Sequence, residues 1–186
     1  MRRIGFFGGC FNPPTIAHME IAQKAINECN LDKIIFIPMG NKYSKKDLID
    51  FKFRYEMLKT YCDFNSKFEV SNMQENQLNK TYAIDTFKDI EKIYCDSENF
   101  YIMGIDNFIK IENWKMHEEL LKNYQYIVFK RDELLEDKNY NNVKFVDLNL
   151  DIISTYVRNL IKENKPTEGL LYKDVEQYIK NNGLYK

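Results

Sequence analysis

The residues best suited to chemistry lie near the start of the sequence, in the segment IGFFGGCFNPPTIAH that covers residues 4–18. A short apolar run ends there in two glycines, a Pro-Pro pair restricts the following turn, and a helix is predicted to begin next to it. The N–H groups of such a turn and the dipole of the helix attract an anion. The segment predicts a phosphate site formed by Gly8, Gly9, Cys10, Phe11, Thr15 and His18.

A second candidate motif, IISTYVR, covers residues 152–158 and also lies at the start of a predicted helix. Ser154 or Thr155 is expected to cap this helix and to direct a hydroxyl at phosphate oxygens, and Arg158 adds a guanidinium one helical turn later. Each motif has a plainer interpretation. Thr15 caps a helix with His18 on the surface, and the second motif is an ordinary cap with a solvated arginine. Two such motifs in one chain, both where anions bind, favour the phosphate site.

The two motifs together resemble those of the nucleotidyltransferases of the adenylyltransferase superfamily. That superfamily has a glycine-rich first turn followed by His or Thr, two residues and His, which Thr15 and His18 match. Its second signature, ISSTxIR, is similar to residues 152–158, with Ile153 in place of the first serine. Ala17 replaces the glycine that usually precedes the second histidine.

Further matches resemble the bacterial nicotinate-mononucleotide adenylyltransferases and cover nearly the whole chain. Residues 54–57 match an RxEM helix start, residues 81–86 match a segment like SYTIDT, and residues 104–106 match a GxD turn. Trp114 is the single tryptophan and stands where that family places one. The resemblance implies transfer of AMP from ATP to nicotinate mononucleotide, which gives deamido-NAD and pyrophosphate in NAD biosynthesis.

The resemblance also implies roles for individual residues. His18, Thr15 and Arg158 are the expected catalytic residues, with His18 as a charged hydrogen-bond donor rather than a base. Mg²⁺ is expected to be held by the substrate phosphates and water, with no protein ligands. The expected ATP site consists of Gly8, Gly9, Cys10, Phe11, His18, Gly104, Asp106, Ser154, Thr155 and Arg158. The expected mononucleotide site consists of Lys45, Thr81, Tyr82, Ala83, Ile84 and Trp114, with Trp114 stacked on the pyridine ring.

The sequence departs from the family pattern at three places. The loop of residues 39–46 lacks the expected proline-rich segment ending in His-Lys, which leaves Lys42, Lys45 or Lys46 as the cations available for a phosphate. In the first turn, Asn12 replaces the usual aspartate and Cys10 the usual threonine. These changes bear on the acceptor substrate more than on adenylyl transfer.

Three alternative functions remain at this level. The Thr-x-x-His form of the first motif also suggests a pantetheine-phosphate adenylyltransferase, or an enzyme acting on another mononucleotide. A non-catalytic nucleotide-binding module with the same fold is an alternative of a different class. An NAD-dependent oxidoreductase would carry GxGxxG in the first turn, and that spacing is absent.

Composition sets broad limits on the function. The 186 residues fit one domain, 1–186, and the formal net charge of -1 gives no reason to expect binding to nucleic acid. The four cysteines form no CxxC pair, which favours free thiols in a reducing cytoplasm. No segment has the roughly 18 apolar residues of a membrane span, so we expect a soluble cytoplasmic protein. The sequence carries no indication of oligomeric state.

Apolar runs and helical periodicities alternate along the chain, which predicts the elements that must position these motifs. Strands are expected at residues 3–8, 33–37, 68–70, 99–103, 126–130 and 143–146, and helices at 17–29, 51–62, 82–94, near Asp106, 116–122, 155–163 and 173–181. This order predicts a Rossmann-like α/β fold, a doubly wound parallel sheet with C-terminal helices. Ligands bind such sheets where the strand order reverses, so residues 8–18 are expected beside residues 104–106.

Overall fold

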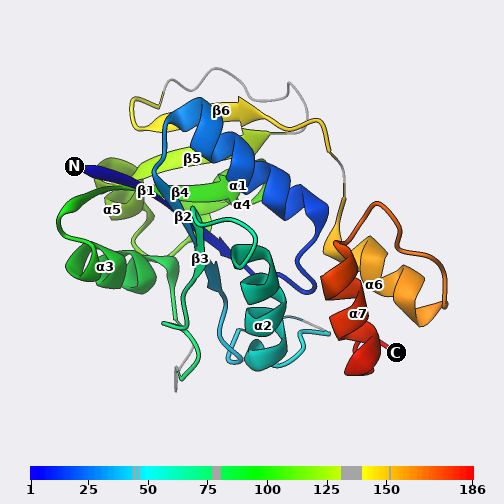
Figure 1. The fold of residues 1–186 in the computed structure, drawn as a ribbon. Coiled ribbons are helices and arrows are strands. Elements are labelled where there is room, and N and C mark those ends of the chain that lie inside the picture. The colour runs from blue at the N-terminus through cyan, green and yellow to red at the C-terminus, as the bar shows by residue number, and fades with distance from the viewer. Residues whose placement is uncertain (44, 46, 77–80, 131–139, 151) are drawn as a thin grey trace.

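The computed structural model describes residues 1–43, 45, 47–76, 81–130, 140–150 and 152–186, in which strands and helices alternate (Figure 1). The strands are β1 (Arg2–Gly9), β2 (Lys33–Pro38), β3 (Phe68–Val70), β4 (Ser97–Gly104), β5 (Gln125–Lys130) and β6 (Val143–Asp147). The helices are α1 (Ile16–Cys29), α2 (Phe51–Cys62), α3 (Ala83–Ile93), α4 (Ile105–Phe108), the 3-10 helix η1 (Ile111–Asn113), α5 (His117–Asn123), α6 (Ser154–Lys162) and α7 (Lys173–Asn181). All but η1 were predicted, with ends within one or two residues.

The strands form one parallel sheet in the order β3-β2-β1-β4-β5-β6, which confirms the doubly wound α/β fold. The order reverses between β1 and β4, the first strands of the two halves. Phe7 of β1 pairs with Ile102 of β4, so both strands end two residues later at the same edge. The predicted pairing of the first turn with residues 104–106 is therefore confirmed.

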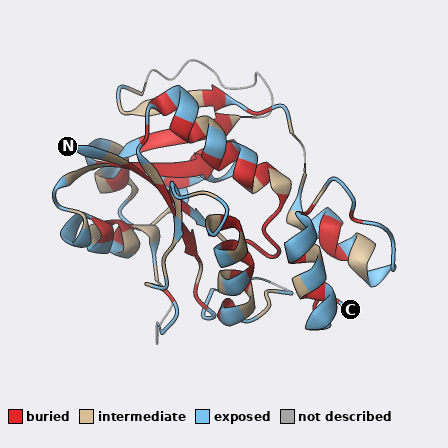
Figure 2. Ribbon diagram, viewed as in Figure 1, coloured by how far each residue is buried: buried red, intermediate tan, exposed pale blue. Residues whose placement is uncertain are grey.

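Buried apolar residues form one core on each face of the sheet. Figure 2 shows that the strands in the middle of the sheet are largely buried. Phe7 packs in the core beneath α1, α2 and α7, whereas Phe6 packs in the core beneath α3, α4 and α5. Neighbouring residues enter different cores because successive side chains of a strand point to opposite faces. Strands buried on both faces are uninterrupted apolar runs, which explains the sequence KIIFI in β2.

Gly5 allows this close packing at the centre of the sheet. A Cβ atom at this position would lie 2.7 Å from the Cδ1 atoms of Ile34 and Ile102, and 2.8 Å from Cδ1 of Leu31. Side chains of β2 and β4 therefore meet across the space that a side chain at Gly5 would fill.

Helices α6 and α7 lie beside α2 and the start of α1, at one side of the sheet (Figure 1). The rings of Tyr61 and Tyr172 meet edge to face with centroids 4.8 Å apart, and the N–H of Ile16 donates to the carbonyl of Leu170 at 3.0 Å. These contacts hold α6 and α7 against the segment that leads into α1. Among the described residues, no helix is both long and apolar enough to span a membrane.

Candidate active site

The carboxyl edge of the sheet is open where β1 and β4 end. Gly8 and Gly104 lie at the ends of these neighbouring strands, and a Cβ atom added to either glycine would have no atom within 4 Å. Gly9 differs, because a Cβ atom there would lie 3.0 Å from the Phe11 ring. Asp106 is exposed in the first turn of α4, two residues after Gly104. The edge therefore has space for a ligand beside the predicted ATP residues.

The imidazole of His18 is fixed by Thr15 and by two phenylalanine rings. The backbone N–H of Thr15 donates to Nδ1 of His18 at 3.0 Å, and the Thr15 hydroxyl oxygen lies 2.8 Å from the same nitrogen. The ring centroids of Phe11 and Phe7 lie 5.1 and 6.0 Å from that of His18. Thr15 is fully buried and contacts His18, so it orients the imidazole.

These hydrogen bonds orient the ring of His18. A backbone N–H is always a donor, so Nδ1 accepts from Thr15. This places a ring proton on Nε2. The sequence pattern gave the position of this histidine, but its proton depends on a backbone group three residues away.

Two buried guanidinium groups bind the carbonyl groups of the first turn. Nη1 of Arg54 donates to the carbonyl of Cys10 at 3.0 Å, and Nη1 of Arg158 donates to the carbonyl of Asn12 at 2.8 Å. Both arginines are buried, and burial lowers the pKa of Arg54. The N–H of Phe11 shares a peptide group with the Cys10 carbonyl and points the opposite way. The turn therefore keeps these carbonyl oxygens, which repel phosphate, on its inner side.

Arg54 and Asn12 were not among the predicted site residues, although both lie at the turn. Nε of Arg54 also donates to the carbonyl of Ile49 at 2.9 Å, which joins the turn to the loop before α2. The match of residues 54–57 to the RxEM pattern was the available signal. It gave no role, because two of the groups that accept from Arg54 are backbone carbonyls, which no residue type reveals.

The α6 motif joins the first turn, but its predicted helix cap was wrong. Ile153 is the N-cap of α6, and the hydroxyl of Ser154 instead donates to the carbonyl of Pro13 at 2.8 Å. Thr155 is exposed, and its hydroxyl accepts from Nη2 of Arg158 at 3.2 Å. The Ser154 hydroxyl is therefore bonded to the first turn and does not cap α6.

Five of the six residues predicted to bind the mononucleotide, all but Lys45, come from two segments, residues 81–84 and Trp114. Tyr82 is the N-cap of α3 and is exposed, and Nζ of Lys115 lies 4.6 Å from the centre of its ring. Lys115 follows Trp114, which is half-buried and packs against the same core as Ala83. Thr81 is half-buried and Ile84 fully buried. The predicted carboxylate and ring sites are therefore neighbours.

The loop between β2 and α2 contains Lys45, which is exposed. Lys46 lies outside the described residues. Buried Gln74 joins the start of this loop to α3: its side-chain oxygen accepts from the N–H of Gly40 at 3.1 Å, and its Nε2 donates to the Thr86 hydroxyl at 2.9 Å. These two hydrogen bonds fix the position of the start of the loop relative to the N-terminal part of α3.

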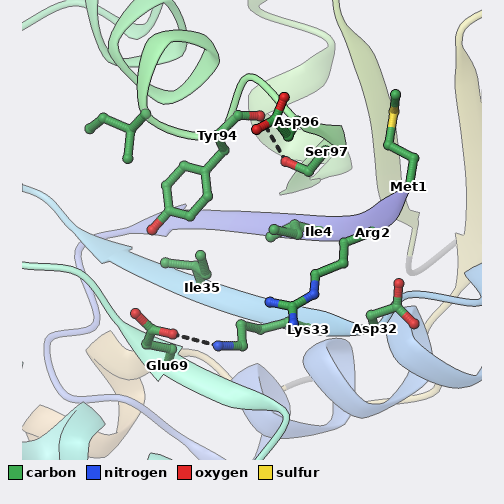
Figure 3. A pocket seen from close by; sticks show the side chains of 11 residues that line it. Met1, Arg2, Ile4, Asp32, Lys33, Ile35, Glu69, Tyr94, Asp96 and Ser97 are labelled. Atoms are coloured by element: carbon green, nitrogen blue, oxygen red, sulfur yellow. Dashed lines mark hydrogen bonds and ion pairs between the residues drawn. The ribbon is translucent and has the colours of Figure 1, made fainter.

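A hollow of about 760 Å³ lies at the opposite edge of the sheet, where β1, β2 and β4 begin (Figure 3). Its floor includes Ile4 and Ile35, and the side chain of Tyr94 lies over it. Lys33 pairs with Glu69 at 2.8 Å inside this hollow. It therefore offers paired charges at the amino ends of the strands, whereas nucleotides bind at the carboxyl ends. We place the candidate site at the carboxyl edge for this reason.

Comparisons with known proteins bear on the family and the fold of the chain. The family profile described as cytidylyltransferase-like matches residues 6–170. A probable nicotinate-nucleotide adenylyltransferase of Clostridium acetobutylicum is 33% identical, with all of both chains covered. A protein of the same name from Caldicellulosiruptor bescii is 33% identical over 99% of each chain. Its fold resembles that of the Plasmodium falciparum nicotinic acid mononucleotide adenylyltransferase complexed with NaAD, with a TM-score of 0.84 and 20% sequence identity. The superposition covers 100% of this chain and 98% of the Plasmodium falciparum chain.

Substitution of Gly8 by alanine tests whether the open edge holds a nucleotide. The added methyl group meets no atom, so we expect the stability of Gly8→Ala to change by no more than about 0.5 kcal/mol. The methyl group would enter the space of a bound nucleotide, so ATP affinity measured by calorimetry should fall about tenfold or more. In the control Gly40→Ala, the Cβ atom would lie 2.6 Å from the backbone oxygen of Gln74, and its melting temperature should fall. Unchanged ATP affinity in Gly8→Ala would place the nucleotide elsewhere.

Proposed function

The chain belongs to the nicotinate-nucleotide adenylyltransferases of the cytidylyltransferase-like family, and from this membership and its site we propose that it transfers AMP from ATP to nicotinate mononucleotide. The products are deamido-NAD and pyrophosphate. The observation that carries the proposal is the first turn, in which His18 is fixed by Thr15 at the edge where the strand order reverses.

The reaction needs two polyanions held in line rather than a covalent intermediate. A phosphate oxygen of the mononucleotide attacks the α-phosphorus of ATP, and the bond from that phosphorus to the bridging oxygen of pyrophosphate breaks. Nε2–H of His18 donates to an α-phosphate oxygen and stabilises the charge that grows there. The guanidinium groups of Arg54 and Arg158 add positive charge behind the turn. In this proposal Asp106 accepts hydrogen bonds from ribose hydroxyls.

The proposal includes Mg²⁺ bound through the substrate phosphates. The described residues contain no group of three or more His, Cys, Asp or Glu side chains placed to hold a metal, which fits coordination by phosphate and water. When bound, the ion partly neutralises the phosphates. The protein's own part is to position them with the first turn and α6.

The acceptor site of the proposal lies between the α3 N-terminus and Trp114. The N–H of Tyr82 donates to the Asp85 carboxylate at 3.3 Å, which leaves the N–H groups of Ala83 and Ile84 to bind the nicotinate carboxylate. Trp114 stacks on the pyridine ring. The carboxamide of nicotinamide mononucleotide has N–H donors of its own, which do not pair with the N–H donors of the helix. The site therefore favours nicotinate mononucleotide.

The proposal is tested by following pyrophosphate release in the presence of ATP and Mg²⁺. Nicotinate mononucleotide, nicotinamide mononucleotide and phosphopantetheine are supplied in separate reactions. We expect rapid release with the first and formation of deamido-NAD. Release with phosphopantetheine alone would identify the pantetheine-phosphate alternative, and no release with any acceptor would leave a non-catalytic nucleotide-binding module.

Two substitutions of His18 separate its two nitrogens. In His18→Gln the amide retains a donor near the position of Nε2, whereas in His18→Asn it retains only a group near Nδ1. If Nε2–H stabilises the transition state, kcat should fall by about 10²-fold or more in His18→Asn and clearly less in His18→Gln. ATP affinity, measured by calorimetry, should change far less than kcat. The reverse order of the two variants would contradict the role of Nε2.

Trp114 provides a signal for the acceptor because it is the only tryptophan. If it stacks on the pyridine ring, its fluorescence should change in a saturable way with nicotinate mononucleotide. ATP and ribose 5-phosphate, which lack that ring, should leave the emission nearly unchanged. An equal response to ribose 5-phosphate would show that Trp114 reports the phosphate or the ribose and does not stack on the ring.

A further inference from the structure

Asn12 joins the first turn to the loop between β2 and α2. Its side chain is almost fully buried, and Nδ2 donates to the carbonyl of Asp47 at 2.7 Å. Its Oδ1 accepts from the N–H of Ile49 at 3.3 Å. A backbone N–H can only donate and a carbonyl can only accept, so these two partners fix the orientation of the amide. Asn12 therefore holds two backbone groups of the loop.

The chemistry of these contacts requires an amide at position 12. An aspartate would place a carboxylate oxygen against the Asp47 carbonyl, where Nδ2 now donates. The asparagine, one departure from the family pattern, thus bonds Asp47 and Ile49, which directly follow the other departure, the altered loop of residues 39–46. We take this to mean that the amide accommodates the particular course of this loop.

Tyr185, which follows α7, sets the position of the amide from the other side. Its hydroxyl donates to Oδ1 of Asn12 at 2.9 Å, and the ring is buried. Burial raises the pKa of this hydroxyl, so it keeps the proton that it donates. The Arg54 and Arg158 guanidinium groups act in the opposite direction but do not overcome burial.

The loop is attached to the rest of the protein at its base and near its end. At the base, Nδ2 of Asn41 donates to the Asp50 carboxylate at 3.1 Å, and Oδ1 of Asn41 accepts from the N–H of Phe51 at 2.7 Å. Asn12 supplies the attachment at Asp47 and Ile49. Between these two attachments lie Lys42 and Lys45, both exposed.

We propose that the Asn12 side chain, oriented by the Tyr185 hydroxyl, is a positioning residue for the acceptor substrate. It holds Asp47 and Ile49 against the first turn so that Lys42 and Lys45, which precede them, serve the phosphate of the mononucleotide. The inference rests on the proposed function, because it assigns that phosphate to the loop. It gives Asn12 a role in acceptor binding and none in the chemical step.

The variant Asn12→Asp tests this role directly. The buried guanidinium groups of Arg54 and Arg158 compensate the new carboxylate, so the protein should fold, as its melting temperature will report. Loss of the donor to Asp47 should raise KM for nicotinate mononucleotide about tenfold. KM for ATP and kcat should change by clearly smaller factors, which report the negative charge added near the two guanidinium groups. Equal changes in all three constants would show a general structural defect and overturn the proposal.

Tyr185→Phe removes only the hydroxyl and should raise the same KM by a smaller factor. Tyr178→Phe is the matched control, because Tyr178 lies on α7 with its ring half-buried and remote from the Asn12 amide. This control should behave like the parent. In an Asn12→Ala background, Tyr185→Phe should have no further effect on KM, since both act through one hydrogen bond. Additive effects would contradict the link between them.

A structural measurement separates failure of this inference from failure of the proposed function. Trypsin cleavage after Lys42 and Lys45, followed by mass spectrometry, should be several-fold faster in Asn12→Asp than in the parent or in Tyr178→Phe. If the parent releases no pyrophosphate with any acceptor, the proposed function fails, and the acceptor role of Asn12 fails with it. If the parent is active and Asn12→Asp shows neither faster cleavage nor a higher KM, this inference alone is overturned.

Discussion

The structure depends on the hydrogen bonds that two buried arginines donate to the carbonyl groups of the first turn. A loop that binds phosphate must present N–H groups and hide the carbonyl oxygens that come with them. Here Arg54 and Arg158 bind the carbonyls of Cys10 and Asn12 from within. Burying a guanidinium costs several kcal/mol unless its donors are satisfied. Carbonyl partners satisfy donors without neutralising the charge, so the positive potential remains available to an anion above the turn.

This arrangement makes the site a junction of distant segments. Arg54 comes from α2, Arg158 from α6 and Tyr185 from the segment after α7, and all three contact residues 10–12. The turn is thus held by α2 and by the C-terminal segments at once. A change in the packing of α6 or α7 would therefore reach the proposed phosphate site without touching a substrate. This explains why two helices outside the sheet layers belong to the functional unit.

Local patterns in the sequence predicted the elements well because those elements follow apolar periodicity. The runs around Phe6 and Ile35 are buried strands, and the helical repeat of α3 follows Ile84, Phe87 and Ile90. The prediction that was wrong concerned a polar atom. Ser154 was expected to cap its own helix, yet it bonds to Pro13, 141 residues earlier. The bond from the N–H of Thr15 to Nδ1 of His18 was likewise not predicted.

The sequence by itself determined the order of strands and helices, the reversal of strand order between β1 and β4, and the two motifs that meet there. Spacing along the chain is enough for this, since burial of an apolar face repeats every two or every 3.6 residues. Only the tertiary structure decided which polar groups satisfy one another. Asn12 and Tyr185 lie 173 residues apart, and no local rule pairs them. A buried polar group takes whichever partner the fold brings within about 3 Å, and only the complete packing fixes that partner.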